Sequence, residues 1–146
     1  MDQRQDISLN LVRSIKTTPE KVFAAWTKPE NLKRWMAPGD DMSVALAETD
    51  LRVGGRYRIV MRETNGTEHR VGGVYREIVP GKKLSFTWAW ESTPENESLV
   101  TIELRKNGTG TELKLAHTKF ATDQAREMHN QGWNGCLAKL ERLMAA

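Results

Sequence analysis

The sequence contains almost no cysteine and no long apolar run. Cys136 is the single cysteine among 146 residues, so the chain cannot form an intramolecular disulfide. No apolar stretch approaches the roughly 20 residues that a membrane-spanning helix needs, and the polar residues 1–6 contain no apolar signal core. These absences argue against a disulfide-rich secreted scaffold, and they predict a cytoplasmic protein without membrane insertion.

Neither sign of charge dominates the chain. The 22 basic and 19 acidic residues leave a formal net charge of +3, which is too small to predict a nucleic-acid partner. Arg56, Arg58 and Arg62 share one predicted strand face, but nearby acidic residues can offset them, so we interpret the row as a solvated outer face. The length and the hydrophobic content of 38% predict one domain spanning residues 1–146.

The residue spacings of familiar metal and catalytic sites are missing. Three histidines and Cys136 are scattered without HxxxH or CxxC spacing, which predicts no metal site. The chain has no Gly-x-Ser-x-Gly elbow, and Gly54-Gly55 lacks the Gly-Lys-Ser/Thr ending of a phosphate-binding loop. We therefore expect no cofactor and no catalytic residues, and the sequence favours binding over catalysis.

An alternating aromatic segment is the strongest positive signal in the chain. Leu84, Phe86, Trp88 and Trp90 alternate with smaller residues over 83–91. Because every second side chain of a strand points to the same face, these four side chains form one wide apolar surface. A surface of this kind needs another element to cover it.

The middle of the chain has the pattern of a β-meander. Asn65-Gly66 and Asn107-Gly108 tolerate the positive φ angles that tight hairpin turns require. An antiparallel sheet with such short links curls, because its strands twist. Alternating apolar residues predict strands over 7–15, 43–48, 56–62, 69–79, 83–91, 99–106 and 111–117.

Helical signals occur after the first strand and at the C-terminal end. Thr18 followed by Pro19 predicts the start of one short helix, and Pro29 predicts a second that continues through Trp35. Over 125–144 apolar residues recur at spacings of three and four, which predicts an amphipathic helix capped by Thr122 or Asp123. We therefore predict an α+β fold: a curved antiparallel six- to seven-stranded sheet grips the long C-terminal helix, and two short helices follow the first strand.

This order of elements and several local motifs resemble the START-like superfamily, also called SRPBCC or the Bet v 1-like helix-grip fold. Within it, the chain is most similar to the family of the C-terminal domain of the activator of heat shock protein 90 ATPase. Members of the superfamily bind lipids, sterols, polyketides and plant hormones. The matching segments are PEKVFAAWT (19–27), LKRW (32–35), DLRVGGRY (50–57), GVYREIVP (73–80), LSFTW (84–88) and GTEL (110–113), together with His117 and Gly132-Trp133.

The resemblance implies a cavity between sheet and helix, and pockets of this kind are lined by apolar and aromatic groups. His117 shares a strand face with Leu113 and Leu115, where it could orient a polar ligand group or be satisfied by one buried partner. His129 precedes Trp133 by four residues on the helix, so the two are neighbours on its surface. The candidate ligand-binding residues are Trp26, Trp35, Tyr57, Met61, Tyr75, Phe86, Trp88, Trp90, His117, Met128 and Trp133.

The expected function is non-catalytic binding of a small hydrophobic or amphipathic molecule, such as a lipid. One or two polar groups, such as His117 or Tyr75, would orient it. Two alternatives stay open. The family resemblance implies a co-chaperone-like interaction module that stimulates heat shock protein 90 ATPase as part of a stress response. An enzyme acting on a bound apolar substrate would instead need a titratable group inside the cavity.

Overall fold

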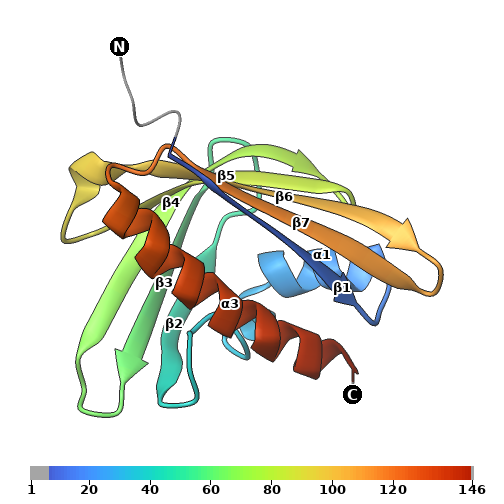
Figure 1. Cartoon of the computed structure of the whole chain (residues 1–146), viewed down its shortest axis with the longest axis horizontal. Helices are drawn as coiled ribbons and strands as arrows, with labels where there is room; N and C mark the ends of the chain where they lie inside the picture. The colour runs from blue at the N-terminus through green and yellow to red at the C-terminus, as the bar shows by residue number, and fades with distance from the viewer. Residues whose placement is uncertain (1–6, 146) are drawn as a thin grey trace.

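A computed structural model describes residues 7–145 of the chain. Residues 1–6, considered above for a signal core, lie outside the described residues, as does residue 146. Within the described part, no helix combines the length and the apolarity that crossing a membrane would require. The elements, shown in Figure 1, are β1 (Leu9–Ile15), α1 (Pro19–Thr27), α2 (Pro29–Leu32), β2 (Met42–Thr49), β3 (Arg56–Glu63), β4 (Glu68–Val79), β5 (Lys83–Trp90), the 3-10 helix η2 (Pro94–Asn96), β6 (Ser98–Asn107), β7 (Gly110–Thr118) and α3 (Asp123–Ala145).

The strands form one antiparallel sheet in the order β1-β7-β6-β5-β4-β3-β2. Strands β2 to β7 follow one another as a meander, and β1 closes the far edge by pairing with β7. The predicted Asn-Gly turns are confirmed, because Gly66 and Gly108 have φ angles of 91° and 63°. Figure 1 shows the sheet curling around α3, which lies across its hollow side. The predicted α+β helix-grip arrangement is therefore confirmed.

The two short helices follow β1 as predicted, but the second is shorter. Thr18 caps α1 by accepting a hydrogen bond from the backbone N–H of Lys21 at 3.3 Å. Helix α2 ends at Leu32, whereas the sequence predicted a helix through Trp35. After Leu32 the chain turns, and the indole N–H of Trp35 donates to the carbonyl oxygen of Ala25 at 2.9 Å. That bond fixes the turn against α1.

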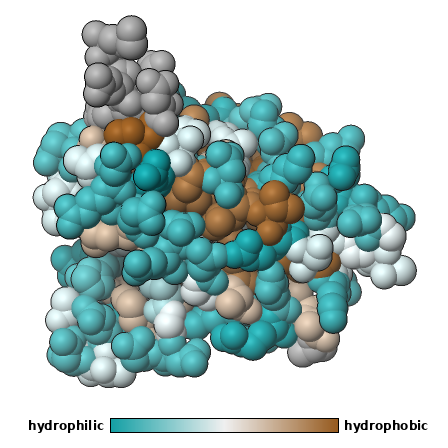
Figure 2. All heavy atoms as spheres, in the orientation of Figure 1, coloured by the Kyte–Doolittle hydropathy of each residue, from teal (hydrophilic) through white to brown (hydrophobic). Residues whose placement is uncertain are grey.

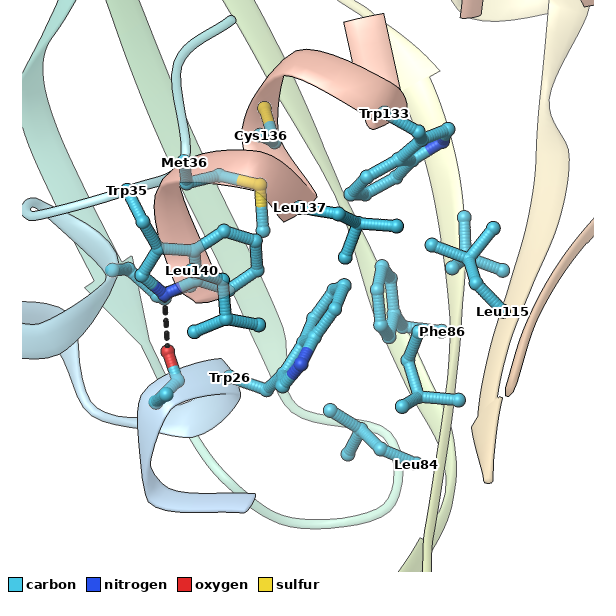
Figure 3. Packing of buried hydrophobic residues seen from close by; sticks show 14 of the residues in the cluster. Trp26, Trp35, Met36, Leu84, Phe86, Leu115, Trp133, Cys136, Leu137 and Leu140 are labelled. Carbon is cyan, nitrogen blue, oxygen red and sulfur yellow. Dashed lines mark hydrogen bonds between the residues drawn. The ribbon is translucent and has the colours of Figure 1, made fainter. Parts of the chain in front are cut away.

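The long helix supplies side chains that pack against the concave face of the sheet. Thr122 caps α3 by accepting a hydrogen bond from Ala125 N at 3.0 Å, which agrees with one of the two predicted caps. Along α3, Trp133, Cys136, Leu137 and Leu140 are buried. Figure 3 shows Leu137 and Leu140 pointing from the helix toward the core around Trp26. This end of the hollow is closed by solid packing.

The outer side of the sheet carries paired charges. Arg58 meets Glu91 at 2.7 Å, and Arg62 meets Glu68 at 2.7 Å. Two of the three arginines in the predicted row are therefore paired with carboxylates on the outer face. Ser85 and Thr87 alternate with the aromatic residues along β5 and are buried. Figure 2 shows that the face bearing α3 is mainly hydrophilic, with an apolar area along β1 and the seam between β1 and α3.

Candidate functional site

A cavity of about 680 Å³ lies between α3 and the β3–β5 part of the sheet. Its size is within the range of small-molecule sites, about 300–1,000 Å³. The large apolar side chains that line it are aromatic or contain a thioether, and they come from the segment after α2, from β3 and β5, and from α3. They are Met36, Met61, Trp88, Trp90, Met128 and Trp133.

The strand register separates the inner wall of the cavity from the charged outer face. Met61 pairs with His69 and Arg62 pairs with Glu68 in the β3–β4 ladder. Because side chains alternate, Met61 and His69 face the helix while Arg62 and Glu68 face outward. Glu68 also accepts from Arg70 at 2.8 Å, and these two arginine contacts lower the pKa of its carboxyl. The inner wall of the cavity is therefore mainly apolar, with the imidazoles of His69 and His129 on it, and Glu68, Arg70 and Glu91 border the cavity.

Three tryptophans form one wall of the cavity, with Trp88 in contact with both Trp90 and Trp133. The ring of Trp88 lies 5.1 Å from that of Trp133 and 5.6 Å from that of Trp90, measured between centroids. These distances are typical of aromatic contact, about 4.5–7 Å. Trp88 and Trp133 are almost fully buried, whereas Trp90 is only partly buried. The three rings thus form a continuous wall, and the open space lies beside them.

His129 joins α3 to this aromatic wall. The indole N–H of Trp90 donates to His129 Nε2 at 2.9 Å, and His129 Nδ1 lies 2.7 Å from the carbonyl oxygen of Ala125. A carbonyl oxygen can only accept, so Nδ1 carries the proton and Nε2 is the acceptor. Burial lowers the pKa of His129, which favours this neutral form. The ring is partly buried and lines the cavity, although His129 was not among the predicted ligand-binding residues.

His117 lies behind the aromatic wall and is not among the residues that line the cavity. Trp133 donates from its indole N–H to His117 Nδ1 at 3.0 Å, and His117 Nε2 bonds Ser98 Oγ at 2.7 Å. Ser98 Oγ in turn donates to the carbonyl oxygen of Trp88 at 3.1 Å. The imidazole is completely buried with both nitrogens satisfied, and burial holds its pKa well below the usual range. This is the satisfied inner histidine that the sequence allowed as an alternative.

The structure brings together only part of the predicted ligand-binding set. Met61, Trp88, Trp90, Met128 and Trp133 line the cavity. Met128, predicted on the buried stripe of the helix, is 66% exposed, at the solvent side of the cavity.

The remaining aromatic candidates lie deeper. A second void, of about 10 Å³, is bordered by Trp26, Tyr57, Tyr75 and Phe86. Trp35 is outside both linings and packs edge-on against Trp26, with ring centroids 4.6 Å apart. These side chains belong to the hydrophobic core. Figure 3 shows Trp26, Trp35 and Phe86 within it.

Several cavity residues were not among the predicted site residues. Met36 and Pro38 lie in the segment after α2, Ser92 and Thr93 follow β5, and His69 faces inward from β4. No periodic pattern marks loop residues such as these. Gly132 and Cys136 of α3 also line the cavity. For Gly132 a signal existed, because a glycine inside an amphipathic helix is destabilising and needs a reason.

The titratable groups at the cavity have limited chemistry. Burial raises the pKa of the Cys136 thiol to about 12, so it is protonated at neutral pH. His69 Nε2 lies 2.7 Å from a carboxylate oxygen of Glu63 at the exposed end. Among residues 7–145, no three histidine, cysteine or acidic side chains are grouped to hold a metal ion. The arrangement is suited to burying an apolar body.

Comparison with known proteins identifies the family. A model for the family described as Activator of Hsp90 ATPase homolog 1-like protein matches residues 16–145. A protein from Chromobacterium violaceum has a similar structure, with a TM-score of 0.89 and 26% identity over 97% of this chain and 99% of that chain. The AHSA1 protein from Silicibacter pomeroyi is similar with a TM-score of 0.83 and 28% identity, over 94% of this chain and 97% of that chain.

A search of curated proteins found no significant match. An AHSA1-like protein from Aeromonas hydrophila, 22% identical over 92% of this chain and 90% of that chain, shares the fold with a TM-score of 0.78. The resemblance expected from the local motifs is confirmed by the family model and by these structures. The chain belongs to the Activator of Hsp90 ATPase homolog 1-like family, within the superfamily of helix-grip domains.

Proposed function

We propose that this protein binds a small apolar or amphipathic molecule in the cavity between the sheet and α3. The observation that carries the proposal is the cavity itself, about 680 Å³ with an inner wall of tryptophan and methionine side chains. A ligand that buried about 300 Å² of apolar surface there would gain about 7 kcal/mol before the entropic costs of binding. Methionine side chains adapt to different shapes, which suits a site that accepts related ligands.

Gly132 supports the proposal because packing does not explain it. A glycine inside a helix costs about 0.5–1 kcal/mol relative to alanine. At Gly135 a Cβ atom would lie 3.3 Å from Gly39 N and 3.4 Å from Pro38, so close contact of the helix with that loop explains this glycine. Gly132 lines the cavity, and a Cβ atom there would meet nothing within 4 Å. A molecule lying against the bare helix would account for it.

The polarity of the wall indicates how such a molecule would lie. The indole N–H groups of Trp90 and Trp133 are already bonded to His129 and His117. The indole N–H of Trp88, which also lines the cavity, is buried without a hydrogen-bond partner among the described residues. A ligand would therefore place its apolar body against the rings of Trp90 and Trp133. Its polar end would lie toward solvent, where Ser92 is exposed and Thr93 is partly exposed. We infer a molecule with one polar end rather than one with polar groups throughout.

The test is titration with N-phenyl-1-naphthylamine, an uncharged apolar fluorophore, followed by fluorescence. We expect saturable binding to the wild type and at least about a tenfold loss of affinity in Gly132→Phe, because the new ring would occupy the cavity. Gln131→Phe is the matched control, since it adds the same ring at an adjacent exposed helix position. Absence of saturable binding, or equal binding by both variants, would contradict the proposal. Native mass spectrometry of protein from its host would detect a co-purified ligand.

A second candidate function is interaction with Hsp90, and the observation that favours it is the match to the family model. Measurement of Hsp90 ATPase turnover with and without this protein separates the two functions. A rise in turnover that Gly132→Phe leaves intact would indicate a surface interaction independent of the cavity. An unchanged rate without a complex on size-exclusion chromatography would remove this candidate.

A further inference from the structure

The Trp90–His129 hydrogen bond connects the two elements that enclose the cavity. Trp90 is at the end of β5 and His129 is in the first half of α3, and both line the cavity. Both side chains are partly buried, whereas Trp88 and Trp133 behind them are buried. The bond, 2.9 Å long, therefore joins sheet and helix on the solvent side of the aromatic wall.

This hydrogen bond depends on the protonation state of His129. Nδ1 already donates to the carbonyl oxygen of Ala125 at 2.7 Å, so Nε2 accepts from Trp90 only while it has no proton. An imidazolium ring has two N–H donors and no acceptor. A proton on Nε2 would point at the indole N–H of Trp90, and two facing donors repel each other. The pair must then separate by movement of the ring, the helix or the strand.

Among residues 7–145, the groups packed against the His129 ring oppose its charge, and none of them is a carboxylate. The rings packed against it are Trp88 and Trp90 from β5, Phe120 from the segment before α3, and His117 from β7, whose ring centroid is 5.1 Å away. Of these only His117 is titratable, and the two histidines disfavour each other's charge.

Other charged groups nearby are engaged elsewhere. His69 of β4 contacts the ring of Trp90, with centroids 6.5 Å apart, and bonds Glu63. On α3 itself, Arg126 pairs with Asp123 and Glu127. Around the cavity, Glu68 pairs with Arg62 and Arg70, and Glu91 pairs with Arg58.

We propose that the Trp90–His129 pair is a pH-sensitive latch that controls exchange of the molecule bound in the cavity. Protonation of His129 breaks the bond to Trp90, loosens the first half of α3 from β5 and lets the ligand leave faster. This inference rests on the proposed ligand-binding function, although the latch itself can be tested without ligand. Histidine is suited to this role because one proton changes its charge, and burial lowers the pKa of His129, so the latch opens in acid.

The ligand-free test is NMR of the indole N–H groups. The chain has five tryptophans, and Trp90→Phe assigns the resonance of Trp90. On lowering the pH from about 8 to about 5, we expect this resonance to shift and its exchange with water to accelerate. In His129→Gln, which keeps an acceptor that does not titrate, the shift should be absent. A Trp90 resonance that ignores pH, or one that titrates unchanged in His129→Gln, would overturn the proposal.

The functional test is the dissociation rate of N-phenyl-1-naphthylamine, which stays uncharged over the same pH range. We expect the wild-type rate to rise about fivefold on acidification, the factor that corresponds to one lost hydrogen bond. Trp90→Phe should dissociate fast at every pH, and His129→Gln should show no acid acceleration. His69→Gln, which removes the other cavity histidine, should retain the pH dependence. Saturable binding at pH 8 with a flat rate profile would overturn the latch alone, whereas no binding at any pH would contradict the proposed function.

Discussion

Trp133 of α3 and His117 of β7 are joined by a buried hydrogen bond of 3.0 Å, which fixes the helix to the sheet behind the cavity. Both side chains are almost completely removed from solvent. The acceptor nitrogen of His117 has its lone pair directed at the indole, and its other nitrogen carries the proton that bonds Ser98. The same bond that positions Trp133 in the cavity wall therefore requires a neutral histidine.

This requirement predicts loss of stability in acid. Burial lowers the pKa of His117 and of His129 below the unfolded value of about 6.5, so the unfolded chain binds more protons below that pH. The stability contribution is fully present above about pH 6.5 and is lost as pH falls toward the folded pKa values. The loss should reach at most about 1.4 kcal/mol per pH unit for each histidine.

Urea unfolding between about pH 8 and about pH 5 measures this effect. His129→Gln should show a shallower decline than the wild type, because one of the two titrating groups is gone. An unfolding free energy that stays constant over the range would contradict the neutral state assigned to both histidines. Loss of stability from protonation of a paired carboxylate such as Glu91 would instead appear at lower pH, because the hydrogen bond from Arg58 lowers the pKa of Glu91.

Replacing Trp133, which donates the hydrogen bond to His117, should destabilise the protein more than the loss of side-chain volume alone would. Trp133→Phe leaves the buried Nδ1 of His117 without its partner and opens space in the wall. We expect a cost of about 2–4 kcal/mol in unfolding free energy. Trp90→Phe is the matched comparison, since Trp90 also donates to a histidine but is only partly buried. Its cost should be about 1 kcal/mol, and equal costs for the two variants would show that burial of the bond is unimportant.

The fold was predictable because the spacing of apolar residues distinguishes strands from helices. Alternation of Leu84, Phe86, Trp88 and Trp90 gave a strand, and the change to spacings of three and four gave α3. Family motifs then identified the way these elements pack. The ends of elements were less predictable, as the early end of α2 shows, because a tertiary hydrogen bond from Trp35 decides where that segment turns.

The position of the cavity could not be predicted from the same patterns. Phe86 and Trp90 share one face of β5, yet Phe86 lies against Trp26 in the solid core while Trp90 lines the cavity. The difference depends on which helix residue lies opposite each ring, and thus on the angle at which α3 crosses the sheet. Met128 continues the apolar stripe of α3 but is exposed for the same reason.

Alanine substitution at the two glycines of α3, Gly132 and Gly135, should change the free energy of unfolding differently, because their surroundings differ. Gly132→Ala should raise the unfolding free energy by about 0.5–1 kcal/mol, because alanine favours the helix and its methyl group meets open space. Gly135→Ala should be neutral or destabilising, because its methyl group would lie 3.3 Å from Gly39 N. Thermal or urea unfolding of both variants gives the comparison. A loss of stability in Gly132→Ala would mean that packing explains this glycine after all.

The buried thiol gives a chemical probe of cavity occupancy. Because burial raises the pKa of Cys136 to about 12, very little reactive thiolate is present at pH 8. We expect iodoacetamide to label the native protein about a thousandfold more slowly than the urea-unfolded chain. Saturation with N-phenyl-1-naphthylamine should slow labelling further, since Cys136 lines the cavity. Gly132→Phe should abolish that additional protection while Gln131→Phe retains it. Protection by the fluorophore that persists in Gly132→Phe would place the bound molecule elsewhere.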